Sequence, residues 1–169
     1  MAFDTTVRRG HPILFGLILL FSLIEGCDTA YIVGQYNSAD NYPNHSIRDR
    51  SRFLVFTSWW TVVFSALYLA FYLTGIFEIF TSIASHGVWL FITWVFWLAG
   101  AAAWSAALSG GVYCGVPGEI GHYHCHQLLA AEAFAWITWI LMTFALIVVI
   151  LLGSRALRSG NRLSGGLTE

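Results

Sequence analysis

The chain has 169 residues, of which 57% are hydrophobic and 10% are charged, and its formal net charge is −1. Soluble domains carry roughly 25% charged residues, so this composition is typical of a small membrane protein. All eight basic residues are arginine, which excludes a phosphate-loop lysine and a Schiff-base lysine. The net charge also lacks the positive excess that is typical of nucleic-acid-binding proteins. The function is therefore expected in or at the bilayer.

Four apolar runs follow one another along the chain, and each is long enough to cross a hydrocarbon core of ~30 Å. In chain order they are residues 12–33, 53–73, 85–108 and 127–152. They predict an all-α integral membrane protein, a four-helix antiparallel bundle. The expected divisions are a short cytoplasmic N-terminus at 1–11, a four-span membrane domain at 12–152 and a cytoplasmic tail at 153–169.

The first run has an alternative interpretation as a signal peptide that ends near Ala30. Paired arginines precede its apolar core, as they do in signal peptides. Glu25 and Asp28 are unfavourable before a cleavage site, however, and the apolar character resumes at Tyr31. These features favour a retained first span.

Arginine placement predicts the orientation of the spans. Five arginines flank the two termini and three lie in the first opposite loop: Arg8, Arg9, Arg155, Arg158 and Arg162, against Arg48, Arg50 and Arg52. Arginine is enriched in cytoplasmic segments, so both termini are predicted to be cytoplasmic. Residues 34–52 and 109–126 would then face outward.

The two outward loops carry features of an oxidising compartment. The first contains the N-glycosylation sequon that begins at Asn44, and the second contains Cys114 and Cys125 with ten residues between them. We expect these cysteines to form a disulfide, which would stabilise the outer hairpin by about 3 kcal/mol on the chain-entropy model.

The third span carries small residues at four-residue spacing, Ala99, Ala103, Ala107 and Gly111. Small residues let helix backbones approach closely in lipid. This face is therefore predicted to be the tightest packing seam, either against another span of the chain or against a second copy.

Three acids lie within the spans, Glu25, Asp28 and Glu132. With cytoplasmic termini, all three are expected in the outer third of the bilayer. Intramembrane acids usually face the bundle interior or an aqueous cleft, so a proton or cation site is one interpretation. The other is that they are protonated or hydrogen-bonded groups near the headgroups.

A histidine cluster precedes the fourth span. His122, His124 and His126, together with Cys114, could supply nitrogen and sulfur ligands to zinc or copper. Their spacing matches no closed structural-zinc pattern, and a disulfide would remove the thiolate, so we predict no metal. The chain also lacks a nucleophile elbow, a C-x-x-C pair and a phosphate loop, and we predict neither enzymatic activity nor a cofactor.

Several patterns together resemble a known family. These are the paired arginines Arg8 and Arg9, the Arg-Ser-Arg-Phe entry to the second span at 50–53, the cysteine-bracketed outer loop, and the small and aromatic segment at 133–140. Over roughly residues 8–155 the chain resembles fungal MARVEL-domain proteins, most closely the eisosome-associated subgroup. Cys114 and Cys125 match that pattern, whereas the span acids and the histidine cluster do not map to it.

The resemblance implies a plasma-membrane tetraspan protein of sterol- and sphingolipid-rich domains, associated with membrane apposition and protein sorting. We therefore expect a non-enzymatic organiser that binds lipids or membrane proteins laterally, with homo-oligomers as a further expectation. The alternatives are an accessory subunit of a larger membrane enzyme and a small cation or proton transporter that uses the span acids.

Overall fold

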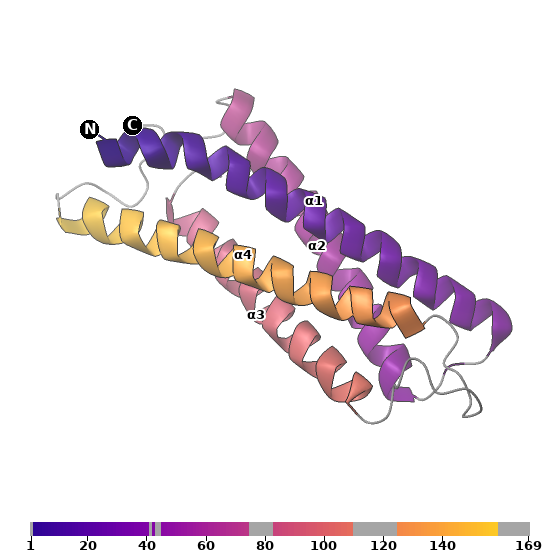
Figure 1. Ribbon diagram of the computed structural model, residues 1–169. Helices are drawn as coiled ribbons and strands as arrows, with labels where there is room; N and C mark the ends of the chain where they lie inside the picture. The colour runs from indigo at the N-terminus through magenta and orange to yellow at the C-terminus, as the bar shows by residue number, and fades with distance from the viewer. Residues whose placement is uncertain (1, 41, 43–44, 75–82, 110–124, 159–169) are drawn as a thin grey trace.

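The computed structural model describes residues 2–40, 42, 45–74, 83–109 and 125–158. These residues form four helices, α1 (Ala2–Ala39), α2 (His45–Thr74), α3 (Ile83–Leu108) and α4 (Cys125–Arg158). The helices run alternately up and down, so the start of α1 and the end of α4 lie at the same end of the molecule (Figure 1). Each helix contains a stretch long and apolar enough to cross a membrane. The predicted fold class is confirmed.

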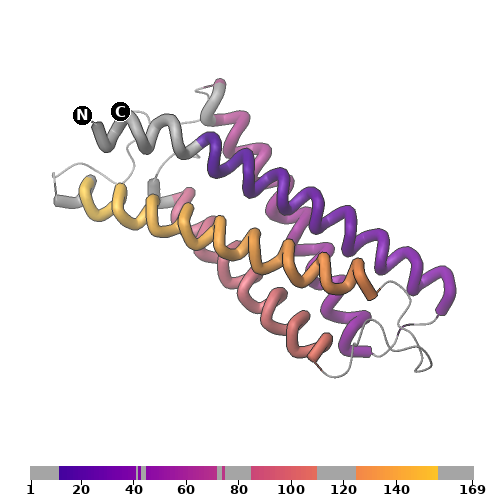
Figure 2. Tube along the Cα trace, viewed as in Figure 1, coloured from indigo at the N-terminus to yellow at the C-terminus, as the bar shows by residue number. Residues whose placement is uncertain are grey.

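The helices close into a ring. Helix α1 packs against α2 and α4, and α3 packs against the same two helices from the other side. The tube view shows α1 and α4 in front and α2 and α3 behind them, with α2 crossing behind α1 (Figure 2). This arrangement agrees with a bundle in which short connections join antiparallel neighbours.

The buried residues of α1 and α4 repeat at alternating spacings of three and four. On α1 they are Phe15, Ile18, Ser22, Glu25, Thr29, Ile32 and Tyr36. On α4 they are Leu128, Ala131, Ala135, Thr138, Met142, Ala145 and Val149. This repeat averages 3.5 residues, which is the spacing of left-handed bundles with knobs-into-holes packing.

The core differs in chemistry from one side of the bundle to the other. The inner face of α2 is mostly hydroxyl, with Ser51, Thr57, Ser58, Thr61 and Ser65 fully buried. The inner face of α3 is mostly aromatic and aliphatic, with Trp89, Leu90, Trp97, Trp104 and Leu108 buried. The polar part of the interior therefore lies between α1 and α2.

The first two helices are longer than the apolar runs predicted. Helix α1 begins ten residues before Pro12, which the sequence placed as its first helical residue. A proline inside a helix lacks one backbone hydrogen bond and crowds the carbonyl four residues before it, so α1 continues through Pro12 at that cost. Helix α2 begins at His45, because the polar segment before Phe53 continues the helical repeat through the buried Ile47 and Ser51.

Candidate functional site

Glu25 is fully buried in the centre of the bundle. It is the fourteenth of the 28 residues in the apolar stretch Pro12–Ala39. The expectation that it lies in the outer third of the bilayer stays a prediction. Among the described residues, neither of its carboxyl oxygens has a hydrogen-bond partner. A lone carboxylate in this environment is costly, and apolar packing alone does not explain its presence.

Hydroxyl groups flank Glu25 along its own helix. Ser22 and Thr29 lie one turn before and one turn after it, and both are fully buried. The Thr29 hydroxyl donates to the backbone carbonyl of Glu25 at 2.7 Å. The Ser22 hydroxyl has no partner within the described part of the chain.

Helix α2 presents further hydroxyls at the same level. The Thr61 hydroxyl donates to the carbonyl of Thr57 at 2.8 Å. The hydroxyls of Thr57 and Ser58 are buried and lack a partner among the described residues. The Ser58 hydroxyl lies on the side of α2 that packs against Gly26 of α1, whereas Thr61 also accepts a hydrogen bond from Trp97 of α3.

Gly26 brings these two helices close together beside Glu25. A Cβ atom placed on Gly26 would lie 3.2 Å from the Cβ of Ser58 and 3.6 Å from the Trp59 indole nitrogen. The Ser58 Cβ is fixed to its backbone and cannot rotate away. The absence of a side chain at Gly26 is therefore what permits this α1–α2 contact.

The other two span acids have separate environments. Asp28 is half-buried and lies one turn after Glu25 on the same helix. Glu132 on α4 instead accepts a hydrogen bond from the Ser105 hydroxyl on α3 at 2.5 Å. Glu25 and Asp28 thus form a pair on α1, whereas the contacts of Glu132 connect it to α3.

Two reciprocal hydrogen bonds connect α2 and α3. The Trp60 indole N–H on α2 donates to the Thr93 hydroxyl on α3 at 3.2 Å. In the opposite direction, the Trp97 indole N–H on α3 donates to the Thr61 hydroxyl on α2 at 2.9 Å. Each helix therefore supplies one tryptophan donor and one threonine acceptor, which fixes their relative register.

Tryptophans also connect α3 to α4. Trp94 donates to the Thr143 hydroxyl at 2.8 Å, and Trp104 donates to the Leu128 carbonyl at 3.0 Å. From α4, the Trp136 indole donates at 3.0 Å to the Ser105 hydroxyl that also bonds Glu132. Sequence analysis assigned no role to these tryptophan partners, because the partners lie on other helices.

His86 lies in an aromatic environment at the opposite end of α3 from Trp104. Its ring is fully buried, with its centroid 4.8 Å from that of Phe15 and 4.6 Å from that of Tyr68. Trp89 completes the group at 6.2 Å from His86. The ring contacts of His86 thus reach both α1 and α2.

A comparison with protein-family models decides the family. The MARVEL model, described as a membrane-associating domain, matches residues 6–155. The chain belongs to the MARVEL family. Comparisons with curated proteins and with solved structures find no match. The match spans all four of the apolar stretches in the structure, so the MARVEL domain is the bundle described above, and the protein is a multi-pass membrane protein.

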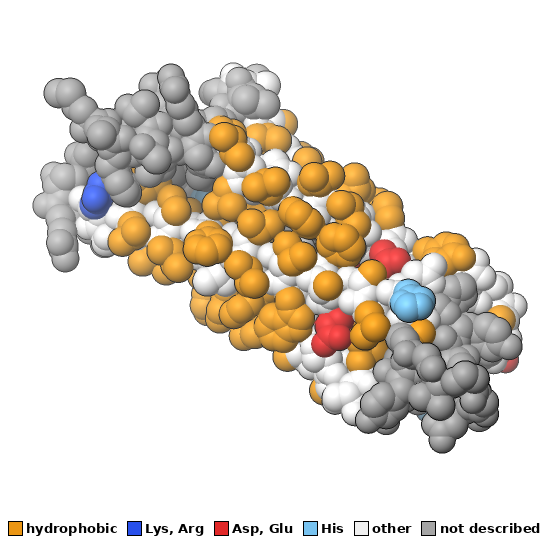
Figure 3. Space-filling model, viewed as in Figure 1, with side chains coloured by type: hydrophobic (Ala, Val, Ile, Leu, Met, Phe, Trp, Pro, Cys, Tyr) orange, Lys and Arg blue, Asp and Glu red, His pale blue; other side chains and the backbone are white. Residues whose placement is uncertain are grey.

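The outer surface of the MARVEL domain is apolar over the length of the bundle. The face in Figure 3 is covered with hydrophobic side chains, and its few acidic side chains lie toward one end. Each helix contributes large exposed apolar residues, among them Ile13, Leu20, Phe56, Val63, Val88, Phe91, Phe144 and Ile150. This distribution, with polar groups inside and apolar groups outside, is the one that lipid surroundings require.

The predicted small-residue seam of α3 is only partly covered within the bundle. Ala99 is exposed, and Ala103 and Ala107 are only half-buried. Gly100 lies in close contact with α2, because a Cβ there would lie 2.9 Å from Cδ2 of Leu54. The carbonyl of Ala103 accepts a 2.6 Å hydrogen bond from Arg50 of α2, so this part of the seam faces α2.

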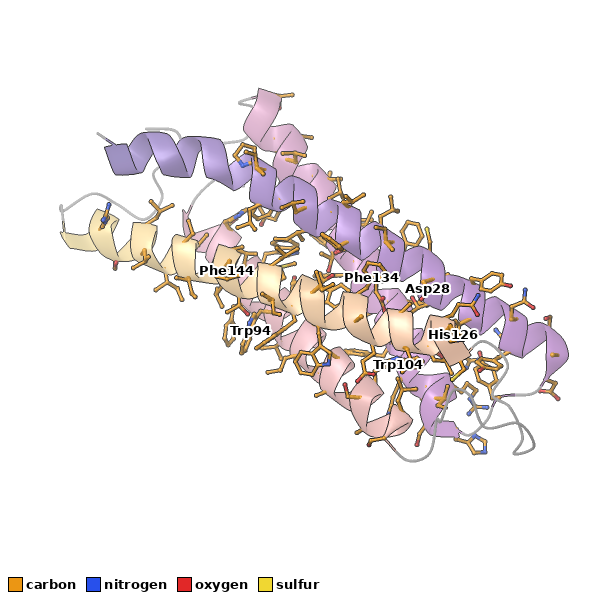
Figure 4. The ribbon with its side chains drawn as sticks, viewed as in Figure 1. Asp28, Trp94, Trp104, His126, Phe134 and Phe144 are labelled. Atoms are coloured by element: carbon orange, nitrogen blue, oxygen red, sulfur yellow. The ribbon has the colours of Figure 1, made fainter. Side chains whose placement is uncertain are left out.

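Several predicted sites fall outside the described residues, namely Asn44, Gly111, Cys114, His122 and His124. The disulfide and the glycosylation site therefore stay predictions. Cys125 is the first residue of α4, and His126 beside it is exposed. Figure 4 shows His126 and Asp28 toward the same end of the bundle. Within the described ranges, no three His, Cys, Asp or Glu residues are grouped so as to hold a metal ion.

Proposed function

We propose that this MARVEL protein is a non-enzymatic organiser that binds lipids or other membrane proteins laterally through its outer helix faces. The observation that carries the proposal is the division between interior and surface. Tryptophan and hydroxyl groups bond one another inside, and large apolar side chains cover the outside. A partner at membrane depth would therefore meet the domain from the side.

Aromatic rings at the edges of α3 offer a specific lateral surface. Between α2 and α3, the exposed Phe56 lies 6.0 Å from Phe96 and 6.0 Å from Trp60, measured between ring centroids. Between α3 and α4, the exposed Phe91 stacks on Trp94 at 6.4 Å, and Trp94 lies 5.8 Å from Trp139. Flat, rigid rings of this kind suit the ring system of a sterol.

The side of the termini, the membrane location and the oligomeric state are proposed from sequence and topology. The shared end of α1 and α4 and the arginine bias support cytoplasmic termini. The resemblance to fungal eisosome-associated proteins supports a plasma-membrane location in domains rich in sterol or sphingolipid. A homo-oligomer would use the same apolar faces.

Photo-crosslinking with a diazirine sterol tests the lateral surface. The full chain in vesicles that contain the probe should be labelled at the peptides around Phe56 and Phe91. Phe56→Leu and Phe91→Leu keep apolar character but remove the ring, and should reduce labelling about threefold each. Ile13→Leu and Ile150→Leu are matched exposed controls and should leave it unchanged. Uniform labelling of all four helices, unaffected by either phenylalanine substitution, would contradict a sterol surface at α3.

A further inference from the structure

Beyond lateral binding, we propose that Glu25 and the hydroxyls around it form an internal site for a hard monovalent cation of the sodium class. The outer surface and this internal site share no residue, so either can fail without the other. Among the described residues, the observation that carries the inference is a fully buried carboxyl group without a partner on α1, together with buried hydroxyls without partners on α1 and on α2, two helices in close contact at Gly26.

The first step is that the carboxyl group of Glu25 is buried without a partner among the described residues. Both carboxyl oxygens are buried and without a protein partner in the described ranges. The arginines at the outer end of α2 are engaged elsewhere, since Arg50 donates to the Ala103 carbonyl and Arg52 donates to Asn37. Among the described residues, none therefore donates a hydrogen bond to the Glu25 carboxyl group or forms an ion pair with it.

The second step is the set of oxygens around the carboxyl group. The hydroxyl oxygens of Ser22, Thr57 and Ser58 are also buried and without a partner in the same described ranges. Ser22 lies one turn from Glu25 on the same face, and Gly26 holds α1 against Ser58. Carboxylate and hydroxyl oxygens are the ligands that hard cations prefer.

The third step concerns charge. One fully buried carboxylate balances one positive charge, and a second carboxyl group, that of the half-buried Asp28, lies one turn away on the same helix. Uncharged residues are buried on each of the other helices, among them Thr57 and Ser58 on α2, Trp97 on α3 and Ala135 on α4. A proton on Glu25 would neutralise the carboxyl group, but a single donated hydrogen bond would leave most of the surrounding hydroxyls without a partner.

Thermal unfolding of the purified full chain in lipid nanodiscs tests this site, with tryptophan fluorescence as the signal. Sodium chloride should raise the Tm saturably, by about 4 °C at ten times the dissociation constant, over N-methylglucamine chloride at equal ionic strength. Glu25→Gln should abolish the sodium-dependent rise. Glu132→Gln is the matched control, because Glu132 is bonded to Ser105, and it should keep the rise.

Chemical labelling gives a second readout that needs no variant. Dicyclohexylcarbodiimide, an apolar reagent, modifies protonated carboxyl groups within membranes, and peptide mass spectrometry locates the product. Sodium should protect Glu25 several-fold and leave Glu132 unaffected. This result would uphold the proposal even if Glu25→Gln failed to fold. A Tm that is indifferent to sodium, with Glu25 labelling unchanged by sodium, would overturn it and assign a proton to the carboxyl group.

Discussion

The indole N–H of Trp97 on α3 donates a 2.9 Å hydrogen bond to the hydroxyl of Thr61 on α2, and both side chains are fully buried. The Thr61 hydroxyl in turn donates a hydrogen bond to the carbonyl of Thr57. Thr61 thus accepts a hydrogen bond from α3 and donates one within α2. Lipid offers no competing partner for either group, so the pair contributes to both stability and register.

Trp97→Phe should therefore destabilise the bundle by about 1–3 kcal/mol, through loss of the hydrogen bond and of ring volume. Equilibrium unfolding in a detergent titration measures the change. Trp59→Phe is the matched control, because Trp59 is 43% exposed, and it should change stability little. A double-mutant cycle with Thr61→Val should give a coupling energy of roughly 0.6–1.7 kcal/mol. Additive effects would show that the hydrogen bond contributes nothing measurable.

The contact at Gly26 leads to a second prediction. Gly26→Leu should force α1 and α2 apart, because the added Cβ meets the Cβ of Ser58 at 3.2 Å. We expect a loss of about 1–3 kcal/mol in unfolding free energy. Gly34→Leu on the same helix is the control, since nothing lies within 4 Å of its added Cβ. Equal losses for the two variants would argue against the close α1–α2 contact.

The contact of Gly100 with α2 can be tested by substitutions at neighbouring positions of α3. Gly100→Leu should destabilise the bundle or change its assembly, because its first side-chain atom already meets Leu54 at 2.9 Å. Ala99→Leu adds comparable bulk at an exposed position and should leave the unfolding free energy of the monomer within about 0.5 kcal/mol. A larger loss of unfolding free energy for Ala99→Leu than for Gly100→Leu in the isolated monomer would support the seam that the sequence predicted.

The predicted disulfide between Cys114 and Cys125 calls for alkylation of the denatured protein with and without prior reduction. We expect only Cys27 to be alkylated before reduction and all three cysteines after it. Cys27 is an internal control, because it is an exposed free thiol in the structure. Alkylation of all three cysteines without reduction would show that the pair does not form.

Sequence alone was sufficient for the four helices and for their antiparallel order, because long apolar runs between charged or turn residues have few other solutions. It was not sufficient for the register between helices. Small residues occupy consecutive positions from Ala99 to Ala103, so spacing could not show that Gly100 rather than Ala99 contacts α2.

The interior site was only partly predictable. Glu25 was recognised as an intramembrane acid, but a single sequence does not show that both of its carboxyl oxygens are buried without a partner among the described residues. The serines of α2 indicated a polar inner face, since Ser51, Ser58 and Ser65 repeat every seven residues. The partners of Trp60 and Trp97 depend on contacts between helices, which a single sequence does not specify.

The most direct test of lateral organisation is the composition of native nanodiscs. The full chain would be extracted from its membrane with a styrene–maleic acid polymer and analysed by blue-native electrophoresis, lipid mass spectrometry and protein mass spectrometry. We predict enrichment of sterol or sphingolipid over the bulk membrane, or a defined membrane-protein partner, and reduced enrichment of sterol in Phe56→Leu combined with Phe91→Leu. A monomer surrounded by lipid of bulk composition, without a protein partner, would contradict the proposed function.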